Sequence, residues 1–345
     1  MGLPKTFIQL QFSSTLVAIL LLFNASAQQF PHRVWTEDGK LHTSMGPYFI
    51  KGVCYHPVAI GETDRSFSRL NEDLALMIEM GVNTIRVYEP IESEEVLNEI
   101  HAAGIKVILG FGYNQNGKYD LLSNTYLDYV KRFKEHPAIL FWELGNEYNY
   151  HPEWFGGSID EWYKTLEGAI ESLHALDPNH PVSTAHGEVP ESELIHRLEA
   201  LDLWGLNVYR WDESQTALDD FASQTDKPVY FSELGADSFM TESNAGFEEG
   251  ENQKAQAMAL YTILSKIKMN DHPPVGVAVF SFTDGWWKAG NPQQQDIGGW
   301  APGSSGVPYD GTANEEYWGL LDIDRNRKEA FWTAKMFFEQ IDWND

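Results

Sequence analysis

The chain has 345 residues, of which 51 are acidic and 24 are basic, so its formal net charge is −27 at pH 7. This charge argues against nucleic acid and anionic membranes as partners, because the phosphate groups of both would repel the protein. Cys54 is the single cysteine of the sequence, which excludes a disulfide within the chain.

The first 27 residues have the features of a secretory signal. Lys5 supplies a positive charge, residues 16–23 form an apolar run, and Ala25 and Ala27 give the small-residue pattern of a cleavage site. The alternative, a membrane anchor, needs roughly 20 apolar residues, more than this run offers. We therefore expect cleavage near Ala27/Gln28 and a secreted or periplasmic mature chain of charge −28 (23 − 51), with no membrane segment.

Short apolar runs typical of strands alternate along the chain with segments whose apolar residues recur at helical spacing. After a polar lead-in over 33–46, the predicted strands cover 48–55, 84–88, 106–112, 139–144, 182–185, 203–209, 229–232 and 275–282. The predicted helices cover 70–80, 96–103, 126–133, 159–176, 191–199, 214–222, 252–269 and 329–341. Residues 285–319 form a long irregular stretch, and long loops in compact domains are often functional.

The regular alternation of strands and helices predicts an α/β fold with a parallel sheet and outer helices. Eight such pairs within residues 28–345 fit a single (β/α)8 TIM barrel. The alternative is an open doubly wound sheet, which normally carries a glycine-rich phosphate-binding turn after its first strand. The sequence at that point is Tyr55-His56-Pro57, so the barrel is favoured.

Two glutamates follow apolar, aromatic strands and therefore fall at the same end of the predicted barrel. Glu147 follows the fourth strand and Glu233 follows the seventh. A carboxylate in such surroundings is costly unless it is paired or hydrogen-bonded, and the catalytic groups of barrel enzymes lie at this face. We therefore predict that these two residues are catalytic. Glu143, within the fourth strand, is expected to contact the barrel interior or an outer helix and is assigned no catalytic role.

Two opposed carboxylates suit glycoside hydrolysis with retention, in which one group attacks the anomeric carbon and the other transfers the proton. We predict Glu233 as the nucleophile and Glu147 as the acid/base. Arg86, at the end of the second strand, would keep Glu233 ionised, and Tyr209, at the end of the sixth, would donate a hydrogen bond to it. The negative charge of Glu233 would raise the pKa of Glu147.

These residues carry a resemblance to clan A glycoside hydrolases. Gly145-Asn146-Glu147 resembles the acid/base motif of that clan, which implies that Asn146 binds the sugar 2-hydroxyl. Ser232-Glu233 resembles its nucleophile motif. The run 81–88 is similar to its second strand and to that of family seventy-two, the β-1,3-glucan transferases. Residues 51–53 and 317–322 are similar to the barrel of glycoside hydrolase family 2.

Other side chains near the predicted strand ends are candidates for sugar binding. Trp286 and Trp287 follow the eighth strand, where the resemblance implies a tryptophan floor under the cleaved sugar. Flat rings suit the apolar face of a pyranose. The further candidates, for which core packing or a structural role is the alternative, are Tyr55, His56 and Asn114. The histidines are scattered without a metal-binding spacing, so we predict no metal and no cofactor.

The favoured function is hydrolysis of a neutral β-linked oligo- or polysaccharide by a retaining β-glycosidase. The resemblance favours a β-glucan, with a β-1,3 linkage first. Two alternatives stay open: transglycosylation by the same residues, and non-catalytic sugar binding by the same barrel. The sequence departs from family 2 in showing no β-sandwich domains before the barrel, which argues against inferring exo action from that resemblance, and from family seventy-two in lacking its disulfides. Endo or exo action is expected to depend on whether the stretch 285–319 blocks one end of the cleft.

Overall fold

The computed structural model describes residues 2, 32–112, 118–298, 300–301, 309–340 and 343. Its eight-stranded parallel sheet closes on itself in the order β10-β13-β4-β5-β6-β7-β8-β9, so the predicted (β/α)8 barrel is confirmed. The barrel strands are β4 (Ile50–Cys54), β5 (Thr84–Val87), β6 (Lys106–Phe111), β7 (Ile139–Asn146), β8 (Val182–Gly187), β9 (Leu203–Asn207), β10 (Val229–Leu234) and β13 (Gly276–Val279).

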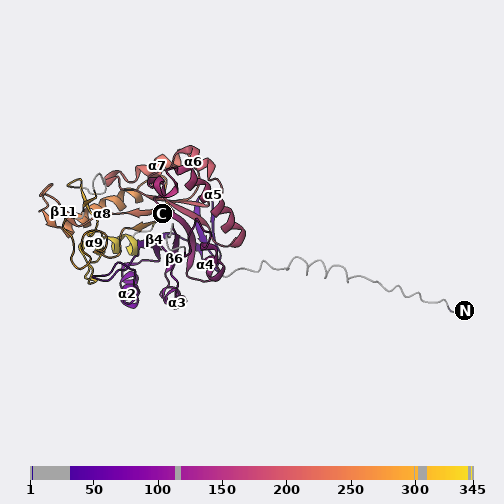
Figure 1. Cartoon of the computed structure of the whole chain (residues 1–345), viewed down its shortest axis with the longest axis horizontal. Helices are drawn as coiled ribbons and strands as arrows, with labels where there is room; N and C mark the ends of the chain where they lie inside the picture. Colours follow the sequence, from indigo (N-terminus) through magenta and orange to yellow (C-terminus); the bar gives the residue numbers. More distant parts are fainter. Residues whose placement is uncertain are drawn as a thin grey trace.

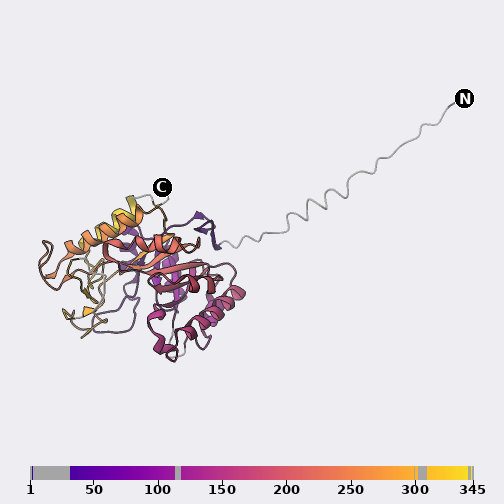
Figure 2. The ribbon, with the colours of Figure 1, turned by 90° about the horizontal axis from the view of Figure 1, so that it is seen from above.

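Helices surround the barrel on its outside, as Figures 1 and 2 show. The α-helices are α2 (Leu70–Met80), α3 (Glu94–Ala102), α4 (Tyr126–Phe133), α5 (Ile159–Leu176), α6 (Ser192–Arg197), α7 (Thr216–Ala222), α8 (Gln253–Lys268) and α9 (Glu329–Lys335). Shorter turns are η1 (Tyr148–Tyr150), η2 (Pro152–Phe155), η3 (Trp211–Glu213) and the π-helical η4 (Met336–Gln340).

The ends of the helices follow from local chemistry. At the start of α3, the hydroxyl of Ser93 accepts a hydrogen bond from the backbone N–H of Val96 at 3.3 Å, which satisfies one of the free donors of the first turn. The helix α2 ends at Gly81, whose φ of 83° is left-handed and whose N–H bonds to the carbonyl of Ile78. Such caps explain why the predicted helix boundaries fall close to the observed ones.

The barrel strands are buried on both faces, which is why they read as nearly continuous apolar runs. Large side chains from alternate positions, among them Ile108, Phe141 and Tyr230, fill the barrel interior as one cluster. A second and larger cluster lies between the strands and the surrounding helices. Because the interior is packed with side chains, a functional site is expected at the mouth where the strands end.

A small antiparallel sheet precedes the barrel. It consists of β1 (Val34–Glu37), β2 (Lys40–Thr43) and β3 (Gly46–Pro47). Val34 and Leu41 are buried and join the cluster that fills the barrel interior. The segment predicted as a polar lead-in therefore forms a paired sheet that packs against the barrel.

The connection between β13 and α9 holds most of the irregular chain. Within it, β14 (Trp300–Ala301) pairs with β15 (Ala313–Asn314). A separate pair, β11 (Phe239–Met240) with β12 (Gly250–Glu251), lies between β10 and α8. The predicted irregular stretch 285–319 lies in this connection; residues 299 and 302–308 lie outside the described ones, as does the predicted signal sequence apart from residue 2. Among the described helices, none has the length and apolar character needed to cross a membrane.

Candidate active site

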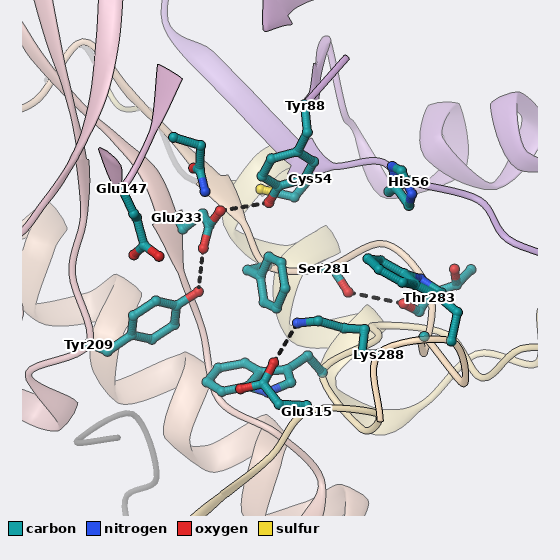
Figure 3. Close-up of a pocket in the computed structure, with 15 residues that line it drawn as sticks. Cys54, His56, Tyr88, Glu147, Tyr209, Glu233, Ser281, Thr283, Lys288 and Glu315 are labelled. Carbon is teal, nitrogen blue, oxygen red and sulfur yellow. Dashed lines mark hydrogen bonds and ion pairs between the residues drawn. The ribbon is translucent and has the colours of Figure 1, made fainter. Parts of the chain in front are cut away.

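A cavity of about 640 Å³ opens at the carboxyl ends of the barrel strands. Glu147 and Glu233 both line it, and Figure 3 shows their side chains on the same side of this cavity. The described residues that line it are Cys54, His56, Tyr88, Asn146, Glu147, Tyr209, Glu233, Phe280, Ser281, Thr283, Gly285, Trp287, Lys288, Glu315 and Trp318. The structure therefore brings the two predicted catalytic carboxylates together.

A sharp turn after β7 presents Glu147 to the cavity. Gly145 has a φ of 75°, and a Cβ on it would meet the ring of Trp162 at 2.7 Å, so only glycine fits there. Glu147 itself has a φ of 53°, a strained conformation for a residue with a side chain. Its N–H is held by the carbonyl of Ala185 in β8 at 2.9 Å. Strain kept in place by neighbouring strands is a feature often found at functional sites.

Glu233 is surrounded by hydrogen-bond donors. Its Oε1 accepts from Nη1 of Arg86 at 2.8 Å and from the hydroxyl of Tyr88 at 2.7 Å. Its Oε2 accepts from the hydroxyl of Tyr209 at 2.9 Å. An ionised carboxylate only accepts hydrogen bonds, so this set of donors matches the charged form. Glu233 is therefore placed as a negative group with both oxygens oriented.

Arg86 lies below the cavity rather than in its lining, with none of its surface exposed. Its guanidinium binds both oxygens of Glu143 at 2.8 and 3.1 Å through Nε, and Nη2 approaches Oε1 of Glu143 at 2.7 Å. The hydroxyl of Tyr230 also donates to Glu143. Arg86 thus balances two buried carboxylates, and Glu143 points into the barrel interior, one of the two places expected for it.

Asn146 is oriented by the same cluster. Its Oδ1 accepts from Nη2 of Arg86 at 2.7 Å and from Nδ2 of Asn207 at 3.1 Å, while Oδ1 of Asn207 accepts from the hydroxyl of Ser232 at 2.6 Å. Within the described residues, both side-chain hydrogen bonds of Asn146 end at its oxygen. The amide nitrogen is therefore the atom of Asn146 that is left to donate to a ligand in the cavity.

The environment of Glu147 differs from that of Glu233. Burial and the negative charge of Glu233 raise the pKa of Glu147 to about 7, against a smaller lowering by a hydrogen bond with Asn207. A large fraction of Glu147 is therefore protonated at neutral pH, beside a carboxylate held by three donors. Two carboxyl groups with such different surroundings can divide the roles of acid and nucleophile.

Two of the predicted sugar-binding residues, Trp287 and His56, lie in the cavity wall. Trp287 is 37% exposed, and its ring centroid lies 4.9 Å from that of His56. Burial, with smaller contributions from Arg65 and Lys288, lowers the pKa of His56 to about 4, so its ring is neutral at physiological pH. Both are placed to contact a bound molecule.

Two other described candidates, Tyr55 and Trp286, are not in the lining. Tyr55 is 1% exposed and its hydroxyl donates to Asp73 of α2 at 2.7 Å. Successive side chains of a strand alternate between faces, so Cys54 faces the cavity and Tyr55 faces the helices. Trp286 is half-buried next to Trp287 but lies outside the lining set. Asn114 lies outside the described residues.

Several lining residues were not among the candidates predicted from the sequence. Tyr88 and Trp318 lie in runs that carry the family resemblance, and Phe280 directly follows β13. The ring of Trp318 meets those of Tyr209 and Phe280 edge-on, with centroids 5.2 and 5.6 Å apart. The position of Tyr88 at the end of a barrel strand was the available signal, whereas nothing local indicated that residue 318 returns to the cavity.

Comparisons with known proteins show which proteins this chain resembles. No family model matches the sequence. A 1,3-beta-glucanosyltransferase of Saccharomyces cerevisiae is 26% identical over 277 residues, which cover 66% of this chain and 57% of that protein. A beta-glucuronidase of Felis catus is 26% identical over 265 residues, which cover 69% of this chain and 38% of that protein. The chain thus spans about half or less of the length of these curated relatives.

Solved structures share the fold. A beta-D-glucuronidase of Dictyoglomus thermophilum superposes with a TM-score of 0.67 at 19% identity, over 90% of this chain and 54% of that one. A family 2 beta-galacturonidase of Eisenbergiella tayi bound to galacturonate gives a TM-score of 0.66 at 19% identity, over the same shares. The predicted resemblance is confirmed. The relatives of this chain are glycoside hydrolases and a transglycosylase of the barrel type.

The described acidic, histidine and cysteine side chains do not gather into a metal site. Within the part of the chain that the structure describes, no group of three or more His, Cys, Asp or Glu side chains is arranged to hold a metal ion. Cys54, in the cavity floor, is buried and its thiol donates to the carbonyl of Ser232 at 3.3 Å. Burial raises the pKa of this thiol to about 12, so it is an unreactive neutral group at neutral pH.

Proposed function

We propose that this chain is a retaining β-glycosidase in which Glu233 is the nucleophile and Glu147 is the acid/base. The observation that carries the proposal is the contrast between the two carboxyl groups in one cavity. Glu233 accepts hydrogen bonds from Arg86, Tyr88 and Tyr209, whereas the pKa of Glu147 is raised to about 7. This division matches the roles that retaining hydrolysis requires.

In the first step, the Glu233 carboxylate attacks the anomeric carbon while Glu147 gives its proton to the departing glycosidic oxygen. The C–O bond to the leaving group breaks as the ester bond to Glu233 forms. The ester is neutral, so the negative charge that helped to raise the pKa of Glu147 is gone, the pKa falls, and Glu147 stays in the deprotonated form that can accept a proton. Glu147 then takes a proton from water, which attacks the anomeric carbon and releases Glu233.

We infer that the cavity binds the pyranose ring of a sugar. Its described lining contains aromatic rings, among them Phe280, Trp287 and Trp318, which suit the apolar faces of pyranoses. We infer a neutral β-linked glycan as substrate and favour a β-glucan with β-1,3 linkages, since the yeast relative is a 1,3-beta-glucanosyltransferase. The beta-glucuronidase relatives make a uronic acid the competing substrate class.

Transglycosylation is the second candidate function. The same yeast relative is named as a transferase, and the covalent ester on Glu233 can be resolved by a sugar hydroxyl as well as by water. Glu147 would deprotonate either acceptor. The choice between the two depends on whether an acceptor sugar binds beside Glu147 more readily than water reaches the ester.

Product analysis on a panel of β-1,3-glucan, β-1,4-glucan, β-mannan and β-galactan oligosaccharides tests the proposal. We expect products whose anomeric configuration by NMR is initially β. Products longer than the substrate would identify transglycosylation, and shorter products alone would identify hydrolysis. Initial release of α-anomers would rule out Glu233 as a nucleophile, and binding without turnover would indicate a non-catalytic barrel.

The pH dependence of activity follows from the raised pKa of Glu147. The acid form is needed in the first step, so kcat/KM should fall about tenfold per pH unit once the pH exceeds about 7. Rates on an aryl glycoside whose leaving group needs protonation should show this fall, the alkaline limb of the pH profile. A 2,4-dinitrophenyl glycoside, whose leaving group departs without a proton, is the control and should show little of it. A limb that persists in Glu147→Gln would contradict the assignment.

Tyr88 is expected to support the nucleophile. Its hydroxyl donates to Oε1 of Glu233 at 2.7 Å, and a hydrogen bond to a charged group contributes about 1.5–3 kcal/mol. We expect Tyr88→Phe to lower kcat roughly 10- to 100-fold while the protein stays folded. Tyr163→Phe, which removes a hydroxyl on the outer helix α5, is the matched control. An unchanged kcat in Tyr88→Phe would show that this donor is dispensable.

The predicted signal sequence stays a prediction. We infer secretion or export to the periplasm from the charge, apolar run and cleavage pattern of residues 1–27. N-terminal sequencing of the protein recovered from outside the cytoplasm tests this inference. The expected first residue is Gln28, and a mature protein that starts at Met1 would contradict it.

A further inference from the structure

Lys288 and Glu315 lie side by side in the cavity wall, on two separate segments of the connection between β13 and α9. Their side chains form an ion pair, with Nζ of Lys288 2.6 Å from Oε2 of Glu315, which Figure 3 shows beside the catalytic pair. The same ammonium lies 4.4 Å from the centroid of the Phe280 ring. Both residues line the cavity, and their side chains are 22% and 33% exposed.

Neighbouring residues hold this pair in place. The carboxylate of Glu316, which has no exposed surface, accepts from the backbone N–H of Ala289 at 3.1 Å and of Asp296 at 2.5 Å. The residue after Lys288 is therefore tied to the residue after Glu315. Gln295 adds a second link, because its Nε2 donates to the carbonyl of Glu316 at 3.1 Å and approaches Oδ2 of Asp284 at 3.2 Å. The ion pair is thus preorganised rather than a contact between two mobile side chains.

The pair also determines whether a ligand in the cavity meets a free positive charge. Among the described residues in the lining, Lys288 is the single lysine or arginine. Arg86 lies beneath the lining and is engaged by Glu143 and Glu233. The His56 ring is neutral, because burial lowers its pKa to about 4. With Glu315 bound to Lys288, a ligand therefore meets no unpaired cation in the described wall.

We propose that the Lys288–Glu315 pair makes the cavity select uncharged sugars over uronic acids, with Glu315 as the specificity-determining residue. The inference rests on the proposed glycosidase function and names what would set its substrate class. A sugar carboxylate that entered this wall would lose its hydration, find the ammonium already occupied, and lie near the negative Glu315. Uncharged hydroxyl groups, in contrast, can donate to Glu315 and accept from Lys288 at once.

Binding of two matched inhibitors tests the proposal without requiring turnover. Isofagomine is a sugar mimic that carries an uncharged hydroxymethyl group. Uronic isofagomine carries a carboxylate in place of that group. Calorimetry on the full-length protein is expected to give at least about tenfold tighter binding of isofagomine. In Glu315→Gln, which frees the ammonium, uronic isofagomine should bind at least about tenfold more tightly than it does to the unmodified protein, and its affinity relative to that of isofagomine should rise by at least the same factor.

Two further variants make the result specific. Lys288→Met combined with Glu315→Gln should abolish the gain, since the freed ammonium is its source. Glu248→Gln removes the same charge at an exposed position outside the cavity lining, and should leave both affinities unchanged. Melting temperatures of all variants should stay close to that of the unmodified protein, because the exchanged side chains are partly exposed.

The outcomes separate this inference from the proposed function. Preference of the unmodified protein for uronic isofagomine, or an unchanged affinity ratio in Glu315→Gln, would overturn the role of the pair while leaving a glycosidase. Failure of both inhibitors to bind the unmodified protein would overturn the proposed glycosidase function and this inference with it.

Discussion

Replacement of Glu233 by alanine is expected to lower kcat by about 10⁴- to 10⁶-fold, the range found when a covalent nucleophile is removed. The structure explains why a large loss is expected: Arg86, Tyr88 and Tyr209 all donate to this carboxylate. None of these donors can form the bond to the anomeric carbon in its place. The measurement is kcat on an aryl β-glycoside whose sugar is chosen from the product panel, with circular dichroism to confirm the fold.

Azide distinguishes the roles of the two glutamates. In Glu233→Ala, azide can enter the space of the lost carboxylate and attack from that face, so the expected product is an α-glycosyl azide. In Glu147→Ala, the ester on Glu233 still forms from an activated substrate, and attack by azide on it gives a β-glycosyl azide. Products of the opposite configurations would exchange the two assignments. Full activity of Glu233→Ala would reject the proposed mechanism.

Replacement of Arg86 by alanine is expected to lower the free energy of unfolding by about 3–5 kcal/mol, the cost of leaving a buried ion pair without one partner. Arg86 has no exposed surface and pairs with Glu143 at 2.7 Å and with Glu233 at 2.8 Å. Its loss would leave two carboxylates in the barrel without their cation. Urea unfolding followed by tryptophan fluorescence measures the effect, and activity should be lost as well because the orientation of Glu233 depends on the same guanidinium.

Two variants control for this result. Arg132→Ala removes an exposed arginine whose nearest acidic partner, Glu94, is 3.8 Å away, and should change stability by less than about 1 kcal/mol. Arg86→Lys keeps the charge but loses the forked geometry that reaches both carboxylates, so we expect a smaller loss than for alanine. A stability of Arg86→Ala equal to that of Arg132→Ala would show that the buried charges are balanced by other groups.

Local patterns in the sequence were sufficient for the architecture. Segments such as Tyr126–Phe133 and Ile159–Leu176 were predicted with the bounds that the structure has, because helical periodicity and end signals are local properties. The lead-in over 33–46 was a miss: β1 and β2 pair with each other and bury Val34 and Leu41 against the barrel. Strands this short, with polar residues on one side, carry too little pattern to be recognised alone.

For the candidate site, residues at strand ends could be located and their orientation could not. The sequence indicated that Glu147, Glu233 and Arg86 come to one end of the barrel, because parallel strands share that end. It assigned Tyr55 to the cavity, whereas a shift of one residue turns a strand side chain to the other face and places its hydroxyl on Asp73. It also left open whether Glu143 faces inward, where the structure pairs it with Arg86.

The sequence by itself determined the barrel fold, the position of Glu147 and Glu233 at one end of it, and the resemblance to barrel glycosidases. Strand alternation and short motifs depend on neighbours in the chain, which is why they can be recognised without the structure. Only the tertiary structure decided which residues surround those glutamates. Lys288 meets Glu315 across 27 positions and Trp318 meets Tyr209 across 109 positions of the chain (315 − 288 and 318 − 209). Contacts between such distant segments arise from the closure of the barrel and the path of its last connection, which no local pattern encodes.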